Sequence, residues 1–476
     1  MPFHRPYRLT DVTVVDPRDA SHLRHRDVHV RDGRIVDVTA AAGGSAPEDV
    51  DGAGRFVVPG YVDMHTHALT GTDPARDLAL MLSFGITGYR QMSGTPRLLA
   101  RRRAGELDVV PDAPRLLATP GALLTPLNAA DPRAAIAEAR RQADAGADFL
   151  KAGLISPEVY FAVQEEADRL GLPVCGHLPA GIDVRAAAMA GFRSVEHVGP
   201  GLGVLAGCSC HEQHLRTPRG GRGGLRLPKV PLPAVDLSSV PLLDRLVATL
   251  LGRIVLNPAQ FTTPGELTAL REAIDTFDEG RARELAHLFA QHGTWHCPTL
   301  VRLRGQLRCD AVELAGDPDL ALVGPSDRRR WVRAAERFRA KFDASARELL
   351  SAQFDLIVRV VGVLAREGVP LLAGTDSTGA VWVVPGAALH EEFDLLAASG
   401  LDAPAVLRAT TVDAARYLGH AEAMGTVEPG KVADMVLLDR DPVVAVAHLH
   451  SVSGVVVHGL HHGRRDIARL RSDEHR

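Results

Sequence analysis

Two histidines stand at the end of an apolar run near the N-terminus. The run is VVPGYVDMHTHALTG, residues 57–71, and the histidines are His65 and His67. Side chains two positions apart in a strand point to the same side, so both imidazoles would face one space. They could share a metal ion, or one ring could pack in a core while the other is solvated. The pair alone leaves both interpretations open.

Apolar runs alternate with helical segments from residue 60 onward. Three of the helical segments have clear start and stop signals, namely Asp131 to Gly146, Ser156 to Gly171 and Asp183 to Gly191. The alternation predicts a parallel α/β structure. Eight runs are present, the strand number of a closed (β/α)₈ TIM barrel: VVPGYVDMH, GITGYRQM, RLLATPG, DFLKAG, LPVCGH, RSVEHV, TWHCPTLV and VPLLAGTD.

Potential metal ligands occupy the ends of these runs. In a barrel, functional groups lie at the carboxyl ends of the strands, which surround a single mouth. Singly, each residue has an ordinary explanation, such as a solvated lysine or a helix N-cap. Jointly they predict a metal site, made of the six residues His65, His67, Lys151, His177, His197 and Asp376.

Short alternating strands are predicted at both ends of the chain. The first sixty residues include a tight turn at Asp32-Gly33, and the strand pattern returns after residue 424. We therefore expect a small β-sandwich domain built from both termini, residues 1–59 and 425–476, beside a barrel of residues 60–424. A long insert at about residues 200–290 is expected to form a lid or a dimerisation arm.

The composition limits the class of partner. The 54 Lys and Arg residues nearly balance the 58 Asp and Glu residues, so no nucleic-acid or membrane partner is expected. No apolar run has membrane-spanning length, the N-terminus lacks the apolar core of a secretory signal, and the five cysteines do not suggest a disulfide framework. We expect a cytoplasmic protein that acts on a small-molecule substrate and forms a homo-oligomer.

The motifs PGYVDMHTH, ADFLKAG, GHLPAG, SVEH, AGTD and EPGKVADMVLLDRDP together resemble the amidohydrolase superfamily over nearly the whole chain. The resemblance is greatest to the metal-dependent hydrolases that include imidazolonepropionase-like proteins, prolidase-type dipeptidases and ochratoxin-degrading amidases. It implies two divalent metal ions, expected to be Zn²⁺. The resemblance implies one ion on His65, His67 and Asp376, a second on His177 and His197, and a carbon dioxide-derived carbamate on Lys151 that bridges both.

The activity that this resemblance implies is cleavage of an amide C–N bond by a metal-bridging hydroxide. The substrate would be small, such as a dipeptide, an N-acyl amino acid or a cyclic amide, and Asp376 would take a proton and pass it to the leaving amine. One alternative is a mononuclear zinc deaminase of a heterocycle, but related deaminases carry glutamate where this chain has Ala180. A second alternative is a metal-free binding or assembly protein.

Three further positions have open roles. Arg90 could bind a substrate carboxylate or form a structural ion pair. His296 could contact substrate at the barrel mouth or face the surrounding helices. The segment CSCHEQH contains Cys208, Cys210, His211 and His214, which could bind structural zinc, although the spacing is not that of a usual zinc finger and a turn in the insert is the alternative.

Overall fold

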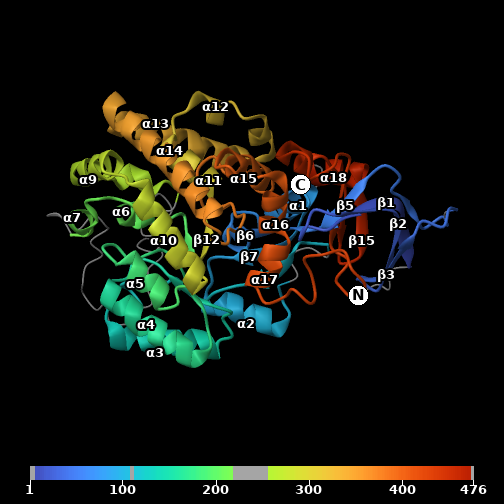
Figure 1. The fold of residues 1–476 in the computed structure, drawn as a ribbon, viewed down its shortest axis with the longest axis horizontal. Coiled ribbons are helices and arrows are strands. Elements are labelled where there is room, and N and C mark those ends of the chain that lie inside the picture. Colours follow the sequence, from blue (N-terminus) through green and yellow to red (C-terminus); the bar gives the residue numbers. More distant parts are fainter. Residues whose placement is uncertain (1–5, 45, 108–111, 218–255, 473–476) are drawn as a thin grey trace.

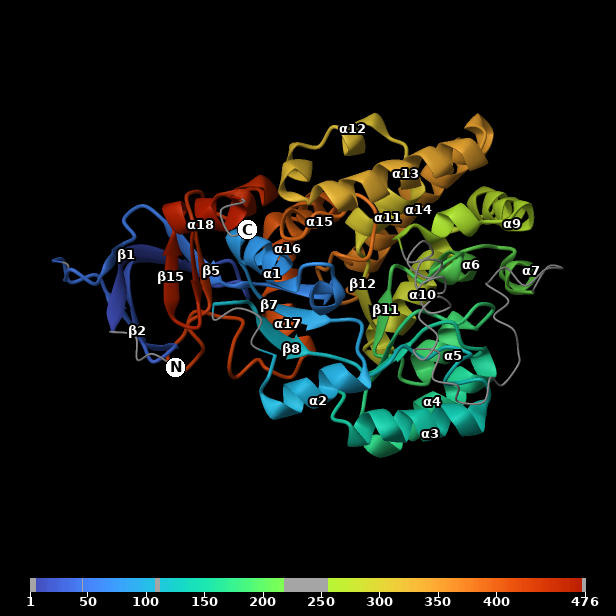
Figure 2. The same ribbon diagram turned by 180° about the vertical axis from the view of Figure 1, so that it is seen from behind.

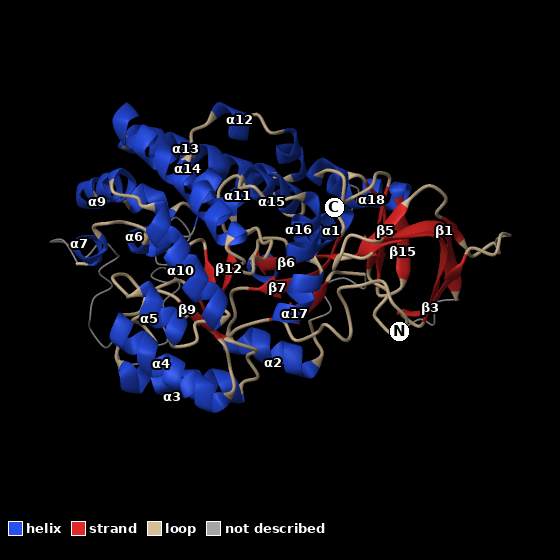
Figure 3. Cartoon of the chain, viewed as in Figure 1, coloured by secondary structure: helices blue, strands red, loops and turns tan. Residues whose placement is uncertain are grey.

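The computed structural model describes residues 6–44, 46–107, 112–217 and 256–472. Helices surround short parallel strands at one end of the molecule, and a larger sheet lies at the other (Figure 1). The view from behind shows both chain termini beside this larger sheet (Figure 2). Colouring by secondary structure separates the two regions clearly (Figure 3). No helix in the described ranges is long and apolar enough to cross a membrane.

Strands from both ends of the chain form the larger sheet. Its order is β15-β14-β13-β5-β1-β2-β3, with β4 paired to β1. The predicted turn at Asp32-Gly33 joins β2 to β3, and both residues have positive φ, 52° and 72°. The strands are β1 (Tyr7–Val15), β2 (His22–Arg31), β3 (Arg34–Ala40), β4 (Val50–Asp51), β5 (Phe56–Pro59), β13 (Met435–Leu438), β14 (Val452–Val457) and β15 (Leu460–Gly463).

The predicted first barrel run divides at Gly60. Its first half is β5, which pairs antiparallel with β13, and its second half is β6 (Tyr61–Thr66), which pairs parallel with β7 (Ile86–Gln91). Gly60 is required there because a Cβ atom would lie 1.9 Å from Oγ1 of Thr87. The chain therefore passes from one sheet to the other at this residue.

The remaining strands form two parallel sheets. One has the order β6-β7-β8 and the other the order β12-β11-β10-β9. Each strand coincides with a predicted apolar run, and most of their residues are buried. The additional strands are β8 (Arg115–Ala118), β9 (Leu150–Ala152), β10 (Val174–Gly176), β11 (Ser194–Glu196) and β12 (Trp295–Cys297).

Isolated parallel bridges connect these two sheets at both sides. Pro120 bridges Phe149 between β8 and β9, and His296 of β12 bridges Leu371. Further along the same segment, Ser377 bridges Thr66 of β6. The predicted eighth run is thus present as a bridged segment, residues 371–377, between β12 and β6. The strands and bridges follow one another in a circular order.

The helices begin where the sequence signals predict. Asp131, Ser156 and Asp183 each accept a backbone N–H bond at the start of α3, α4 and α5. The helices are α1 (Pro74–Ser83), α2 (Pro96–Ala104), α3 (Pro132–Asp144), α4 (Pro157–Leu170), α5 (Val184–Met189), α6 (Gly203–Gly207), α7 (Glu212–Arg216), α9 (Pro264–Asp275), α10 (Glu279–His292), α11 (Leu300–Leu307), α12 (Val312–Ala315), α13 (Pro325–Lys341), α14 (Ala344–Arg366), α15 (Ala387–Ala398), α16 (Ala403–Thr410), α17 (Val412–Tyr417) and α18 (Arg464–Arg471).

The last part of the predicted insert is helix α10. Helix α10 packs against α5 and α14 and leads directly into β12, so it belongs to the helical layer around the parallel strands. The middle of the predicted insert, residues 218–255, lies outside the described residues. Its role as a lid or dimerisation arm therefore stays a prediction.

Candidate metal centre

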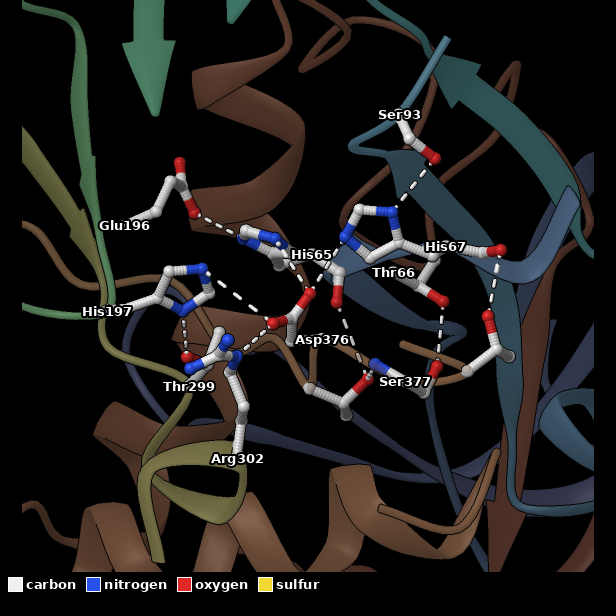
Figure 4. Close-up of polar contacts among 12 residues, drawn as sticks. His65, Thr66, His67, Ser93, Glu196, His197, Thr299, Arg302, Asp376 and Ser377 are labelled. Carbon is white, nitrogen blue, oxygen red and sulfur yellow. Dashed lines mark hydrogen bonds and ion pairs between the residues drawn. The ribbon is translucent and has the colours of Figure 1, made fainter. Parts of the chain in front are cut away.

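Three histidines converge on the carboxylate of Asp376 (Figure 4). Nε2 of His65 lies 3.2 Å and Nε2 of His67 lies 2.8 Å from Oδ1 of Asp376. Nε2 of His197 lies 3.8 Å from Oδ2. The ligand atoms of His65, His67 and Asp376 all lie within 4.8 Å of one another. Residues from β6, the end of β11 and the bridged segment thus meet at one point.

The backbone around Asp376 fixes this convergence. The amide N–H groups of Thr375 and Asp376 donate to the carbonyl oxygen of His65, at 3.1 and 2.7 Å. The buried carboxylate of Asp63 accepts from the amides of His65 and Thr375, which ties β6 to the bridged segment. Asp376 and His197 both have a φ of 58°, a left-handed conformation that costs energy for residues other than glycine. Such strain is typical of functional sites.

Glu196 fixes the orientation of the His65 ring. Its Oε2 lies 2.7 Å from Nδ1 of His65, and its Oε1 accepts from Arg90 at 2.8 Å. Burial alone would raise the pKa of Glu196, but Arg90 and His65 outweigh it and lower the pKa to about 2. An ionised Glu196 accepts from Nδ1 of His65 and so orients the ring with Nε2 toward Asp376. This Nε2 is buried, with Oδ1 of Asp376 3.2 Å away.

The other two histidines are oriented in the same way. Nδ1 of His197 lies 2.6 Å from Oγ1 of Thr299, whose hydroxyl donates to the carbonyl of Pro298. The Thr299 oxygen must therefore accept from His197, which leaves Nε2 unprotonated. Nδ1 of His67 lies 2.9 Å from Oγ of Ser93. Hydrogen bonds of this kind to the outer nitrogen are the usual companions of metal-bound histidines.

His177 and Lys151 complete the predicted ligand set. The His177 ring lies 5.3 Å from the His197 ring, centroid to centroid. Burial lowers the pKa of His177 to about 3 and that of His67 to about 4, so both are neutral and able to bind a metal near pH 7. Burial also lowers the pKa of Lys151, although the Asp376 carboxylate acts in the opposite direction. Its amine is therefore nearer to the neutral, nucleophilic form than that of an exposed lysine.

Arg302 is a site residue that the sequence analysis missed. It lies on α11, and its Nε forms an ion pair with Oδ2 of Asp376 (Figure 4). Nη1 donates to Oε1 of Gln306, and the side chain is only 11% exposed. Burial would raise the pKa of Asp376, but Arg302 and the nearby histidines hold it well below its usual range. No motif marks Arg302, because it stands inside a helix rather than at a strand end.

Arg90 is placed as a structural ion pair. Its side chain is fully buried, and its guanidinium donates to Glu196, to the carbonyl of Met64 and to the hydroxyl of Tyr417. All three partners are protein groups, and Arg90 is connected to the histidine cluster through Glu196. A contact between Arg90 and a substrate carboxylate does not fit this arrangement.

His296 faces the helices rather than the cluster. The ligand atoms of Cys297, His65 and Glu196 lie within 4.8 Å of one another, so Cys297 faces the cluster. Adjacent residues of a strand point to opposite sides, so His296 points away from it. The fully buried His296 ring accordingly packs against Phe289 of α10, with centroids 4.6 Å apart. Within the described residues, neither ring nitrogen has a hydrogen-bond partner. A substrate contact at His296 does not fit this position.

The burial of His296 predicts acid sensitivity. Burial lowers its pKa from 6.5 to about 3, so between these pH values the unfolded chain binds a proton that the folded chain does not. The free energy of unfolding therefore rises with pH in this window. As the pH falls, His296 lowers this free energy by about 1.4 kcal/mol per pH unit. We expect His296→Phe to reduce the slope of unfolding free energy against pH by this amount, measured by denaturant unfolding between pH 6 and pH 4. Exposed His287→Phe is the control, and equal slopes in all three proteins would contradict the assignment.

Comparison with known proteins agrees with the predicted resemblance. Residues 357–463 match the amidohydrolase family. A stretch of 60 residues is 47% identical to an imidazolonepropionase of Bradyrhizobium sp., but it spans only 12% of this chain and 15% of that relative. A dihydroorotase of Pelotomaculum thermopropionicum is 26% identical over 438 residues, 90% of this chain and 88% of the relative.

Solved structures of amidohydrolases share the fold over almost the whole length. A bottromycin amidohydrolase matches 98% of this chain and 89% of its own, with a TM-score of 0.68 and 25% identity. A Xaa-Pro dipeptidase matches 96% of this chain and 100% of its own, with a TM-score of 0.60 and 17% identity. The chain therefore has an α/β fold of the TIM-barrel type. The predicted likeness to the imidazolonepropionase-like and prolidase-like branch is confirmed.

Proposed function

We propose that the protein is a metal-dependent hydrolase that cleaves an amide C–N bond of a small substrate. The substrate class is that of dipeptides, N-acyl amino acids or cyclic amides. The observation that carries this proposal is the orientation of His65, His67 and His197. Each turns Nε2 to Asp376 while a protein group binds its Nδ1. Three imidazoles directed at one buried carboxylate, each held by a hydrogen bond at its other nitrogen, are the arrangement of donors that a metal centre needs.

The residues fit two divalent ions of the zinc type. The buried Nε2 of His65 faces the Asp376 carboxylate, and imidazoles together with a carboxylate are the donors that Zn²⁺ prefers. His65, His67 and Asp376 would hold one ion, and His177 and His197 the other. Lys151 would bridge both as a carbamate formed with carbon dioxide. When bound, such ions lower the pKa of a shared water and polarise the scissile carbonyl.

Asp376 is the residue that moves the proton. Its Oδ1 faces His65 and His67, whereas its Oδ2 faces His197 and Arg302. We infer that Asp376 accepts a proton from the attacking water and gives it to the leaving amine. Arg302 favours the ionised carboxylate, so Asp376 holds the proton weakly and releases it readily. Metal binding at Asp376 and ion pairing with Arg302 would compete for the same group.

The circular order of strands and bridges supports a closed barrel of residues 60–424. The sheet that β1–β5 share with β13–β15 likewise supports a composite β domain of residues 1–59 and 425–476, in which these strands form a single sheet. Its packing as a β-sandwich stays a prediction. A mouth at the carboxyl ends of β6, β9, β10, β11 and the bridged segment would hold the metal centre. The expected homo-oligomer and cytoplasmic location stay predictions.

The activity is tested by a substrate screen with and without metal. Dipeptides, N-acyl amino acids and lactams are incubated with protein dialysed against a chelator, and then with added Zn²⁺ and bicarbonate. We expect amide cleavage that is lost on chelation and restored by Zn²⁺. Ammonia release from heterocycles without amide cleavage would instead indicate a deaminase. A protein that binds no metal under any of these conditions would favour the binding or assembly alternative.

Thr299→Val is expected to weaken metal binding without unfolding the protein. Valine removes the oxygen that accepts from Nδ1 of His197, so the ring loses its fixed orientation and tautomer. Loss of such a partner weakens metal binding by about 10–100-fold, measurable by competition with a fluorescent chelator. The matched control is Thr268→Val on α9, whose hydroxyl donates only to the carbonyl of Pro264. Equal metal affinities in the two variants would show that Thr299 does not support the centre.

A further inference from the structure

We propose that His211, His214 and Glu272 form a second, surface zinc site, separate from the centre at Asp376. Nδ1 of His211 lies 3.0 Å and Nδ1 of His214 lies 2.6 Å from Oε1 of Glu272. The three ligand atoms lie within 4.8 Å of one another. Glu272 lies in the last turn of α9, and the histidines lie at the start and within α7. Figure 1 shows α7 and α9 at the same end of the molecule.

The position of α7 is fixed by the glutamate that stands between the two histidines. Glu212 is almost fully buried, and both of its carboxylate oxygens accept from Arg185 at 2.8 Å. Arg281 donates to the same carboxylate at 2.7 Å. Because these ion pairs hold Glu212 inward, its neighbour His211 and the more distant His214 project from a fixed helix. The two imidazoles therefore need little further ordering to bind a common ion.

A second set of contacts brings α9 to α7. Ser209 forms an antiparallel bridge with Phe277. The Cys210 amide donates to the carbonyl of Thr276, and the Asp278 amide donates to the carbonyl of Cys208, both at 2.9 Å. These bonds join the residues just before α7 to the residues just after α9. The last turn of α9, which carries Glu272, is thereby placed beside the histidines.

The structure changes the ligand set that the sequence suggested for CSCHEQH. Cys208 is buried, and the sulfur of Cys210 lies 3.7 Å from a carboxylate oxygen of Asp278 rather than joining the group. Glu272 takes their place from far along the chain. Two imidazoles and one carboxylate are a known zinc ligand set that leaves a fourth position open. The His211 and His214 side chains are 56% and 60% exposed, so water can reach that position.

An ion at this site would connect two segments that are distant in sequence. Helix α7 ends at Arg216 and α9 begins at Pro264. A metal link between them closes a long loop in the unfolded chain, and its binding free energy contributes to folding stability. An ion bound there, with water in its fourth position, is thus expected to stabilise the fold, and hydrolysis at the Asp376 centre does not require it.

The test compares His211→Ala/His214→Ala and Glu272→Gln with a control, His287→Ala. His287 is also exposed and lies 2.7 Å from Glu367, but no third ligand from the described part of the chain joins that pair. Each protein is dialysed against a series of buffered free Zn²⁺ concentrations, and bound zinc is counted by elemental analysis. Thermal unfolding is followed at each concentration. Hydrolytic activity is recorded beside both.

We expect the double variant to bind about one zinc ion per chain fewer than the wild type and the control. The zinc-dependent rise in unfolding temperature should shrink in the double variant and in Glu272→Gln, while hydrolytic activity is unchanged. The proposal is overturned if the double variant and the control bind equal amounts of zinc throughout the series. It is equally overturned if the extra zinc of the wild type is unaffected by Glu272→Gln, since the carboxylate would then not be a ligand.

Discussion

Asp376→Asn is expected to lower kcat for amide hydrolysis by about 10²–10⁴-fold, the contribution of a positioned acid–base group. Asparagine keeps one oxygen beside His65 and His67 but cannot accept a proton. It also removes the charge that faces Arg302. The measurement is steady-state kinetics on the best substrate of the screen, with kcat and KM separated. The effect should fall on kcat, because proton transfer belongs to the chemical step.

The control for this substitution is Asp355→Asn. Asp355 lies on α14, its side chain is 67% exposed, and it pairs with Arg308 at 2.6 Å, so it provides a carboxylate–arginine contact outside the centre. Its kcat should equal that of the wild type. An Asp376→Asn protein that folds, binds metal and retains wild-type kcat would remove Asp376 from the proton path.

Glu196→Ala is expected to destabilise the fold by about 3–5 kcal/mol, because Arg90 would then be a buried charge without its carboxylate. Both side chains are fully buried, 2.8 Å apart, and Glu196 also binds His65. The measurement is the free energy of unfolding in denaturant near pH 7. Glu165→Ala is the control, since Glu165 makes an exposed i,i+4 pair with Arg169 and such pairs contribute at most about 1 kcal/mol.

A double variant separates the pair from its surroundings. In Arg90→Met/Glu196→Leu both charges are replaced by apolar groups, which is often nearly neutral for a buried ion pair. We expect it to recover most of the stability that Glu196→Ala loses. Metal affinity should remain low, because His65 still lacks its carboxylate partner. Equal instability of the single and double variants would show that the buried charge of Arg90 is not the cause.

Local signals predicted much of the fold. Caps at Asp131, Ser156 and Asp183 marked three helices, and the Asp32-Gly33 turn marked a hairpin. These features depend on neighbouring residues alone. By contrast, β5 pairs with β13, from the other end of the chain, and no local pattern records such a partner. The eighth run also forms only isolated bridges, which its apolar character could not distinguish from a regular strand.

The predicted metal ligands could be found in the sequence for a similar reason. Each stands at the end of an apolar run, and the carboxyl ends of barrel strands lie around one mouth, so the sequence predicts that these residues lie together. Glu196, Thr299 and Arg302 were missed because their roles depend on contacts with residues distant in the chain. Arg90 was ambiguous because a guanidinium suits both a substrate carboxylate and a buried glutamate. His296 was ambiguous because alternation along a strand shows that neighbouring side chains point to opposite sides, but not which side faces the helices.

The most direct test of the account is the metal content of Lys151→Ala beside the wild type. Both are prepared in the His211→Ala/His214→Ala background, purified without chelator in bicarbonate buffer and counted by elemental analysis. The account predicts about two divalent ions per chain with Lys151 present and a clear loss in the alanine variant, because the bridging ligand is gone. Equal metal content with and without Lys151 would contradict a lysine-bridged pair of ions at this centre.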